Sequence, residues 1–223
     1  MADPDAKHGS ASSDDEQKPR SFDERAVDWD TPERVARAKV AAETIRGAVE
    51  FPHGARAIDV GAGTGLLGLA LLDRLGELVL ADTSDGMIEQ AQRKIAEGKL
   101  ENVRAIHLDL IADPPPDGAP FDAVVSQLLL HHVEDTQAAL SSMHRLLVPG
   151  GQLVALDLDT EDGSFHGSVG TSVHHLGFDR EALVVLARSV GFLDVHVGAG
   201  GMIGDAERGE ELFPMFLLTA RRG

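Results

Sequence analysis

After Pro52 the sequence alternates short apolar runs with segments whose apolar residues recur at helical spacing. The predicted strands are residues 55–60, 77–82, 103–108, 121–126, 151–157, 193–197 and 212–220. The predicted helices between them are residues 65–75, 84–97, 135–147 and 179–190. Alternating helices and near-continuous apolar strands are typical of a parallel sheet that is covered by helices on both faces. We therefore expect an α/β fold built on a doubly wound, mostly parallel, seven-stranded sheet.

The last two predicted strands differ from the others because no helix separates them. Only a glycine-rich segment, residues 198–210, joins them, and it is predicted to be a loop. A short connection of this kind suits antiparallel neighbours. We expect the last strand to be antiparallel and the pair to lie at one edge of the sheet.

Three segments are expected along the chain. Residues 1–21 are acidic and, after the first methionine, contain no Val, Ile, Leu, Met or aromatic residue. Such a segment cannot bury enough apolar area to offset the entropy of ordering, so it is predicted to be a disordered tail. Residues 22–50 are expected to form an N-terminal cap segment and a helix, for which Thr31 provides the N-cap. Residues 51–223 are expected to form the main domain.

The composition excludes several classes of protein. The chain has no cysteine, which excludes disulfides and thiolate metal sites and fits a reducing compartment. It has no run of 18 apolar residues, and its first residues lack the apolar segment of a signal peptide. We expect a cytoplasmic protein without stable membrane association.

The formal net charge is -17 at pH 7. A surface of this charge repels phosphate backbones, so nucleic acid is not an expected partner. A well-solvated surface is the alternative explanation of the same charge. The sequence leaves the oligomeric state open.

The segment IDVGAGTGLLG, residues 58–68, follows the first predicted strand. Its residues Gly63, Gly65 and Gly68 form a G-x-G-x-x-G pattern, which lets the backbone approach a nucleotide-like ligand closely. Nicotinamide dinucleotides use this pattern, but other nucleotide-like cofactors use it too. The pattern alone does not distinguish between them.

Three acidic residues at successive strand ends narrow the choice of cofactor. Asp59 precedes the glycines, where a carboxylate suits a cationic ligand and disfavours a pyrophosphate. Asp82 ends the second strand, at the distance expected for a carboxylate on ribose hydroxyls. Asp109 follows the third strand, where it suits an adenine amino group, and Met87 and Leu110 offer apolar faces to the ring. Together these residues describe a site for an adenosine with a zwitterionic tail and no phosphate, which is S-adenosyl-L-methionine.

Four stretches of the chain, AIDVGAGTGLLGLAL, LADTSDGMIEQAQRK, FDAVVSQLLLHHVED and LLVPGGQLVALDLD, resemble the class I S-adenosylmethionine-dependent methyltransferases. The chain most resembles the small methyltransferases of ubiquinone and menaquinone biosynthesis, over roughly residues 22–220. The resemblance implies a Rossmann-like methyltransferase fold and methyl transfer from S-adenosyl-L-methionine. The acidic charge and the short substrate loops favour a small-molecule methyl acceptor.

The resemblance also implies which residues bind the cofactor. In that family the glycine loop holds the methionine portion, the acid after the second strand binds the ribose, and the end of the fourth strand lies beneath the sulfonium. Phe22 and Trp29 would help to close the pocket. The implied cofactor-binding residues are Asp59, Gly61, Ala62, Gly63, Gly65, Asp82, Thr83, Met87, Asp109, Leu110, Ser126 and Gln127. The chain has no tyrosine, so any phenol that relatives use is missing or replaced.

Methyl transfer from a sulfonium needs a base only when the acceptor atom carries a proton. The candidate bases are His132, which follows the fourth strand, and His174 and His175, which lie in a long loop over residues 158–178. The alternatives are helix-end packing for His132 and simple exposure for the two loop histidines. Adjacent histidines cannot usually bind one ion together, so no metal site is expected.

Two other functions stay open. An NAD(P)-dependent oxidoreductase would also use the glycine pattern, although the chain has no tyrosine for a catalytic Tyr-Lys pair. The fold would also serve as a binding platform without catalysis. The residues leave the acceptor atom open among O, N, S and C.

Overall fold

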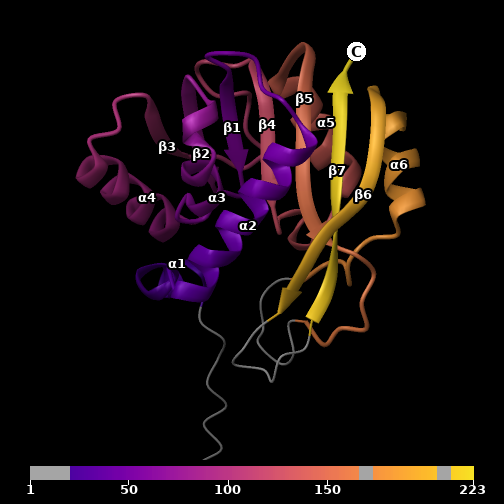
Figure 1. Ribbon diagram of the computed structural model, residues 1–223, viewed down its shortest axis with the longest axis horizontal. Helices are drawn as coiled ribbons and strands as arrows, with labels where there is room; N and C mark the ends of the chain where they lie inside the picture. The colour runs from indigo at the N-terminus through magenta and orange to yellow at the C-terminus, as the bar shows by residue number, and fades with distance from the viewer. Residues whose placement is uncertain (1–20, 166–172, 205–211) are drawn as a thin grey trace, which may run out of the picture.

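The computed structural model describes residues 21–165, 173–204 and 212–223. Within these ranges, seven strands form one sheet in the order β3-β2-β1-β4-β5-β7-β6 (Figure 1). Neighbours from β3 to β5 are parallel, whereas β7 is antiparallel to both β5 and β6. The strands are β1 (Arg56–Val60), β2 (Glu77–Asp82), β3 (Val103–His107), β4 (Phe121–Gln127), β5 (Leu147–Leu158), β6 (Phe192–Gly204) and β7 (Leu212–Arg222). The expected mostly parallel sheet with an antiparallel last strand is confirmed.

The glycine-rich segment 198–210 is not a loop over its first part, because β6 continues to Gly204. The register of β6 against β7 shifts after Ala199, and a Cβ on Gly200 would lie 2.4 Å from the carbonyl oxygen of Phe216. Glycine therefore lets β6 stay paired with β7 across an irregularity instead of ending the strand. The rest of the segment, residues 205–210, lies outside the described residues.

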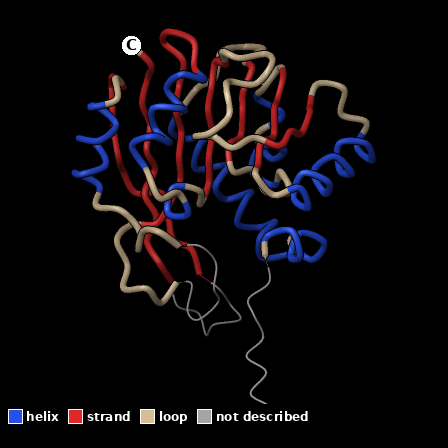
Figure 2. Tube along the Cα trace, turned by 180° about the vertical axis from the view of Figure 1, so that it is seen from behind, coloured by secondary structure: helices blue, strands red, loops and turns tan. Residues whose placement is uncertain are grey.

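Helices cover both faces of the sheet, as the views from the front and from behind show (Figures 1 and 2). The helices on one face are α2 (Pro32–Ala48), α3 (Leu66–Ala70) and α4 (Asp85–Gly98), and those on the other are α5 (Thr136–Leu146) and α6 (Arg180–Ser189). Each face buries its own apolar cluster against the strands. The predicted N-cap Thr31 is confirmed, since its side chain accepts a hydrogen bond from the backbone N–H of Arg34. The side chains at the N-caps of α4, α5 and α6 accept in the same way from the first turn, and they belong to Ser84, Asp135 and Asp179.

The N-terminal segment begins with α1 (Phe22–Arg25) and η1 (Ala26–Asp28), and two aspartates, Asp23 and Asp30, fasten it to α4 and its N-cap. Asp23 Oδ1 accepts hydrogen bonds from Ser84 Oγ at 2.6 Å and from the backbone N–H of Gly86 at 2.9 Å. Asp30 forms an ion pair with Lys94 of α4. These contacts hold α1 against the N-terminal end of α4, below the strand ends (Figure 1).

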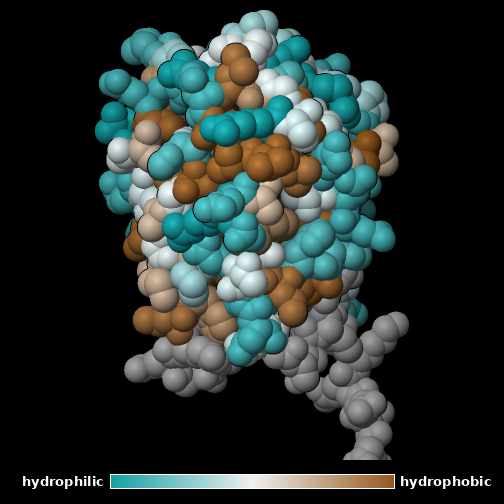
Figure 3. All heavy atoms as spheres, turned by 90° about the vertical axis from the view of Figure 1, so that its right-hand side faces the viewer, coloured by the Kyte–Doolittle hydropathy of each residue, from teal (hydrophilic) through white to brown (hydrophobic). Residues whose placement is uncertain are grey.

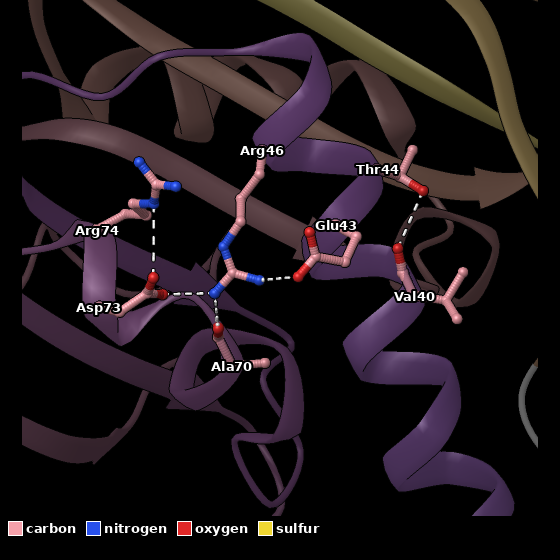
Figure 4. A network of polar contacts seen from close by, with 7 residues as sticks. All are labelled: Val40, Glu43, Thr44, Arg46, Ala70, Asp73 and Arg74. Carbon is pink, nitrogen blue, oxygen red and sulfur yellow. Dashed lines mark hydrogen bonds and ion pairs between the residues drawn. The ribbon is translucent and has the colours of Figure 1, made fainter.

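The other end of the N-terminal region is fixed by a network around Arg46 of α2 (Figure 4). The guanidinium of Arg46 donates to Asp73, to Glu43 and to the carbonyl oxygen of Ala70, and Arg74 also pairs with Asp73. Asp73 and Arg74 belong to η2 (Leu72–Arg74). The network thus anchors the carboxyl-terminal part of α2 to α3 and η2.

The side of the molecule formed by β6 and α6 carries a band of hydrophobic residues among hydrophilic ones (Figure 3), and Val185 and Leu193 are exposed there. No helix in the described ranges is long and apolar enough to span a membrane. Of the predicted tail, residues 1–21, all but Ser21 lie outside the described residues, and Ser21 caps α1.

Candidate active site

A cavity of about 600 Å³ lies between the carboxyl ends of the parallel strands and the N-terminal helices. Residues at the ends of β1, β2 and β4 line it, and the strand order reverses between β1 and β4. Open α/β sheets bind ligands at such a switch point. This cavity is therefore the candidate active site.

The glycine loop after β1 forms one wall of the cavity. Gly61, Gly63 and Gly65 have positive φ angles of 68°, 54° and 84°, a region that side chains rarely adopt. A Cβ on Gly61 would lie 2.7 Å from the Leu129 side chain, so the loop also requires glycine for space. Gly65 caps α3 instead of lining the cavity. The loop thus presents bare backbone to a ligand.

Close packing explains why the third position of the pattern, Gly68, is a glycine. A Cβ there would lie 2.6 Å from the Leu80 side chain and 2.9 Å from Asp59 Oδ2, so glycine is what lets α3 pack against the sheet. The N–H of Gly68 donates to Asp59 Oδ2 at 2.9 Å. Asp59 is 1% exposed, and burial raises its pKa to about 7, although the Gly68 hydrogen bond opposes the shift. A buried carboxyl poised near neutrality at the cavity wall suits a ligand with a cationic group.

Asp82 ends β2 and faces the glycine loop. Its Oδ2 accepts from the N–H of Gly63 at 2.7 Å, and its Oδ1 accepts from the N–H of Ser84 at 2.9 Å. Burial raises the pKa of Asp82, and these backbone hydrogen bonds partly offset it. Each carboxylate oxygen has a second lone pair, so Asp82 can hold the loop and accept from ligand hydroxyls together.

Asp109 follows β3 at the far end of the cavity. Its Oδ1 accepts from the backbone N–H groups of Ile111 and Ala112, both at 2.9 Å, and these hydrogen bonds lower its pKa. Asp109 is therefore a turn cap and a cavity residue at once. Met87 and Leu110 line the cavity beside it, which gives the apolar faces expected for a planar ring.

The structure brings together most of the predicted cofactor residues. The predicted residues that line the cavity are Asp59, Gly61, Ala62, Gly63, Asp82, Thr83, Met87, Asp109, Leu110 and Gln127. Gly65 and Ser126 do not line it, and Ser126 is buried in β4. In the described part of the chain Gln127 Nε2 is a buried donor without a hydrogen-bond partner. That donor, the loop and the carboxylates fit S-adenosyl-L-methionine, which carries an ammonium and a carboxylate at one end, a sulfonium in the middle, and ribose hydroxyls and adenine at the other end.

The N-terminal segment covers the cavity. Phe22 and Trp29 line it and contact each other edge to face at 5.8 Å, and His132 packs against Phe22 at 5.5 Å. Trp29 lies beside the glycine loop, since a Cβ on Gly63 would be 3.7 Å from Trp29 Nε1. The placement of both aromatic residues agrees with the expected role in closing the pocket.

A buried histidine–aspartate pair lies at the other side of the cavity. His131, in η3 (Leu130–His132), is 1% exposed and Asp157 of β5 is fully buried, with His131 Nδ1 2.5 Å from Asp157 Oδ1. Asp157 also accepts from the N–H of Leu130 and from the N–H of Leu158, both at 2.7 Å. Since Asp157 is an acceptor in each contact, Nδ1 carries the proton and Nε2 is the basic nitrogen of neutral His131.

His132 stacks on His131 with ring centroids 4.1 Å apart, and both histidines line the cavity. His174 and His175 lie outside its lining. His174 is exposed, and His175 Nε2 lies 3.1 Å from Thr136 Oγ1 and 3.0 Å from the carbonyl oxygen of Val133. The structure thus brings one of the three predicted bases, His132, to the cavity, and the role of the other two stays a prediction that this placement does not favour.

Sequence reasoning missed several residues of the site. Asp157 lies in β5 within the stretch LLVPGGQLVALDLD, whose resemblance gave it no role, and Phe165, in the loop after β5, lines the cavity. Leu128 lines the cavity with a φ of 55°, a conformation that is costly for a branched residue and that is common at functional sites. Arg25, Arg34 and Arg37, in α1 and α2, were also missed as cavity residues. Helical spacing in α2 was the available signal for the last two.

Comparison with known proteins agrees with this geometry. Residues 57–151 match the family model described as a methyltransferase domain. The chain is similar to an uncharacterised methyltransferase of Mycobacterium tuberculosis, with 38% identity over 103 residues, which are 46% of this chain and 50% of that protein. It is also similar to the demethylmenaquinone methyltransferase of Thermus thermophilus, with 41% identity over 104 residues and 46% of each chain. The chain spans about half the length of the curated relatives it matches.

Solved structures share the fold. A putative methyltransferase of Haloferax volcanii, solved in a complex with the Trm112 methyltransferase activator, has a TM-score of 0.72 at 20% identity and covers 90% of this chain and 96% of its own. A SAM-dependent methyltransferase of Aquifex aeolicus has a TM-score of 0.66 at 17% identity, with 90% and 98% covered. The fold and the site define a protein that binds a nucleotide-like cofactor at a sheet switch point. More narrowly, residues 57–151 match a methyltransferase domain, the fold is the one shared with S-adenosylmethionine-dependent methyltransferases, and the cofactor that these relatives imply is S-adenosyl-L-methionine.

Proposed function

We propose that this protein transfers the methyl group of S-adenosyl-L-methionine to a small-molecule acceptor. The observation that carries the proposal is the cavity in which a glycine loop meets Asp59, Asp82 and Asp109 from three successive strand ends. The matched methyltransferase domain and the relatives that are named as methyltransferases support it. The cavity is closed over by α1, which suits an acceptor of small size.

The chain's own residues have to bind, orient and exclude water. When bound, S-adenosyl-L-methionine supplies a methyl group that is already activated on a sulfonium, so proximity and alignment provide most of the catalysis. We assign Asp82 to the ribose, Asp59 to the cationic tail, and Asp109 with Met87 to the adenine. Trp29 covers the glycine loop and excludes water from it.

Any proton on the acceptor has to be removed near the end of β4. His131 and His132 line the cavity there, and we propose that they meet the acceptor. Asp157 is a positioning residue, because its hydrogen bond fixes the ring orientation and the tautomer of His131. If the acceptor atom belongs to a thioether or a tertiary amine, it carries no proton, and the two histidine rings only shape that part of the cavity.

Isothermal titration calorimetry and thermal unfolding test the proposal directly. S-adenosylhomocysteine is expected to bind one molecule per chain and to raise the free energy of unfolding by about 2.7 kcal/mol at a hundredfold excess over its dissociation constant. NAD is expected to give no shift, because a pyrophosphate at the glycine loop would face the Asp59 and Asp82 carboxyls. A shift with NAD and none with millimolar S-adenosylhomocysteine would establish the oxidoreductase alternative instead.

An acceptor screen separates an enzyme from a binding platform. Transfer of a labelled methyl group from S-adenosyl-L-methionine to any member of a small-molecule library shows catalysis. Tight S-adenosylhomocysteine binding with no transfer to a broad set of hydroxyl, amine, thiol and activated-carbon acceptors would favour the non-catalytic alternative.

A further inference from the structure

The N-terminal helices bring positive charge to a cavity whose strand ends carry carboxylates. Arg25 of α1 and Arg34 and Arg37 of α2 line it. Arg34 and Arg37 are three residues apart, so they lie on one face of the helix. The chain has only 20 Lys and Arg residues against 37 Asp and Glu residues. Three guanidinium groups that line one cavity are therefore a local concentration of positive charge in a protein whose net charge is negative.

Arg34 is held in place by neutral partners. Its Nη1 donates to the carbonyl oxygen of Trp29 at 3.2 Å, and its guanidinium carbon lies 4.3 Å from the centre of the Trp29 ring. Within the described ranges, Arg34 has no carboxylate at ion-pair distance. The contacts with Trp29 orient the guanidinium group of Arg34 without neutralising its charge. That charge can therefore attract an anionic group of a ligand in the cavity.

Arg37 lies one turn further along α2, toward the end of β6. Its Nη2 donates to the carbonyl oxygen of Gly204 at 3.3 Å. The neighbouring β6 residue Ile203 pairs with Phe213 of β7, and Phe165 packs edge to face on Phe213 at 5.2 Å. Phe165 also lines the cavity. Arg37 is therefore on the side of Phe165 and the strands β6 and β7, away from the β2 and β3 ends that carry Asp82 and Asp109.

We infer that the methyl acceptor carries an anionic oxygen group, a carboxylate or a phosphate, which Arg37 binds with the help of Arg34, while its apolar body lies against Phe165. Guanidinium forks bind both groups in a bidentate manner. S-adenosyl-L-methionine has one carboxylate of its own, but Arg37 lies on the Phe165 side of the cavity, away from the proposed cofactor residues Asp82 and Asp109. The inference rests on the proposed function and names the acceptor class for that same site.

Calorimetry on the protein saturated with S-adenosylhomocysteine tests the inference. The probes are benzoate, phenyl phosphate and the uncharged benzamide. Benzoate or phenyl phosphate is expected to bind roughly tenfold or more tightly than benzamide, the scale of a charge-assisted bidentate pair. The tighter of the two anions identifies the carboxylate or the phosphate as the recognised group.

Variants assign the effect to the cavity. Arg37→Gln is expected to abolish the preference for the anions over benzamide, and Arg37→Lys to restore only part of it because the fork is lost. The matched control is Arg93→Gln, which removes the same charge from an exposed α4 residue whose partner is Glu89. It is expected to leave all three affinities within twofold. Thermal unfolding of each variant shows that it is folded.

S-adenosylhomocysteine and methylthioadenosine, which lacks the amino acid tail, separate the acceptor from the cofactor. Arg37→Gln is expected to leave the affinity for both within about twofold. Equal binding of benzamide and the anions, no binding of either anion at millimolar concentration, or an Arg37→Gln loss that appears in S-adenosylhomocysteine affinity would each overturn the inference. Failure of the wild-type protein to bind S-adenosylhomocysteine would instead overturn the proposed function.

Discussion

The two sides of the cavity are built in different ways. The side that we propose for the cofactor, called the cofactor side, consists of the glycine loop and the residues that end β1, β2 and β3, which are neighbours in the sheet and close in sequence. The acceptor side combines the first turns of α2, the η3 turn and the segment after β5, which are far apart in the chain. One side is therefore encoded by local motifs, and the other exists only once the sheet has assembled.

The sides also differ in charge. Carboxylates dominate the cofactor side, whereas guanidinium groups and imidazoles gather on the acceptor side. If this division is functional, changes on one side should alter the affinity for S-adenosylhomocysteine, and changes on the other should alter turnover or acceptor binding. Each prediction below tests that separation.

The largest effect is expected from Asp157→Asn on the acceptor side. Asparagine cannot accept all the hydrogen bonds that Asp157 accepts from His131 Nδ1 and from the N–H groups of Leu130 and Leu158, because one carboxylate oxygen becomes an NH2 donor. The imidazole therefore loses its fixed position and tautomer. With an acceptor that loses a proton, turnover is expected to fall by about 10²–10⁴. The affinity for S-adenosylhomocysteine should stay within about threefold of the wild type, because Asp157 is not a cavity residue of the cofactor side.

The pH profile separates positioning from a structural defect. Wild-type turnover should require the deprotonated base and should therefore rise with pH on the acidic side of the profile. Asp157→Asn should shift or flatten this rise. A variant that loses turnover and S-adenosylhomocysteine affinity in parallel, with an unchanged pH profile, would show that Asp157 only holds β4 and β5 together.

The same division explains how much the sequence could predict. The seven strands, the N-caps and the cofactor residues from Asp59 to Leu110 follow from short-range patterns, because the turn chemistry and the strand ends are local. In the sequence Asp157 looks like any other strand residue, because its partner His131 is 26 positions away. His174 and His175 were predicted to reach the site because of the loop they occupy, but their backbone N–H groups donate to the carbonyl oxygen of His131, and neither side chain lines the cavity.

The glycine-rich stretch before residue 205 shows the same lesson in the sheet. Glycines usually mark a loop, yet Gly200 is required by a close approach to Phe216 across the strand pair. The positive φ of Leu128 was likewise unpredictable, because nothing in its residue type favours that conformation. Both features are set by long-range packing.

Asp82→Ala is expected to give the largest effect on the cofactor side. Loss of hydrogen bonds to a charged group should weaken S-adenosylhomocysteine binding by about 1.5–3 kcal/mol, which is roughly 10- to 100-fold. Because Asp82 also accepts from the N–H of Gly63, part of the loss reflects a less ordered loop. The control is Glu97→Ala on the exposed face of α4, for which calorimetry should show no change. Unchanged affinity in Asp82→Ala would mean that the ribose lies elsewhere.

A smaller effect is expected from titration of Asp59, whose pKa is raised by burial to about 7. Only the ionised form attracts the cationic tail, so S-adenosylhomocysteine affinity should rise roughly tenfold from pH 6 to pH 8, with proton release on binding. In Asp59→Asn the affinity should be lower and nearly independent of pH. An equally steep dependence in Asp59→Asn would place the titrating group elsewhere.

Stability should respond to Asp59 with the opposite sign. Because its pKa in the folded protein is raised above the ordinary value of 3.8, the folded state binds this proton more tightly than the unfolded chain does. The unliganded protein therefore loses stability from this residue as the pH rises from about 4 to 7. Asp59→Asn should unfold at a higher temperature than the wild type at pH 8, and the difference should shrink toward pH 4.

The smallest effect is expected from the loop histidines, and it decides whether they belong to the acceptor side. His175→Ala removes the Nε2 donor that is shared between the carbonyl oxygen of Val133 and Thr136 Oγ1, so it should cost about 1–2 kcal/mol of unfolding free energy. His174→Ala changes an exposed side chain and should cost a few tenths of a kcal/mol at most. Turnover of both variants should stay within about threefold of the wild type, and their affinity for S-adenosylhomocysteine should not change. A loss of 10² or more in turnover for either single variant, with stability and cofactor affinity intact, would show that the substituted loop histidine is the catalytic base. It would also show that the part of the loop that carries the two histidines reaches the acceptor in the catalytic state.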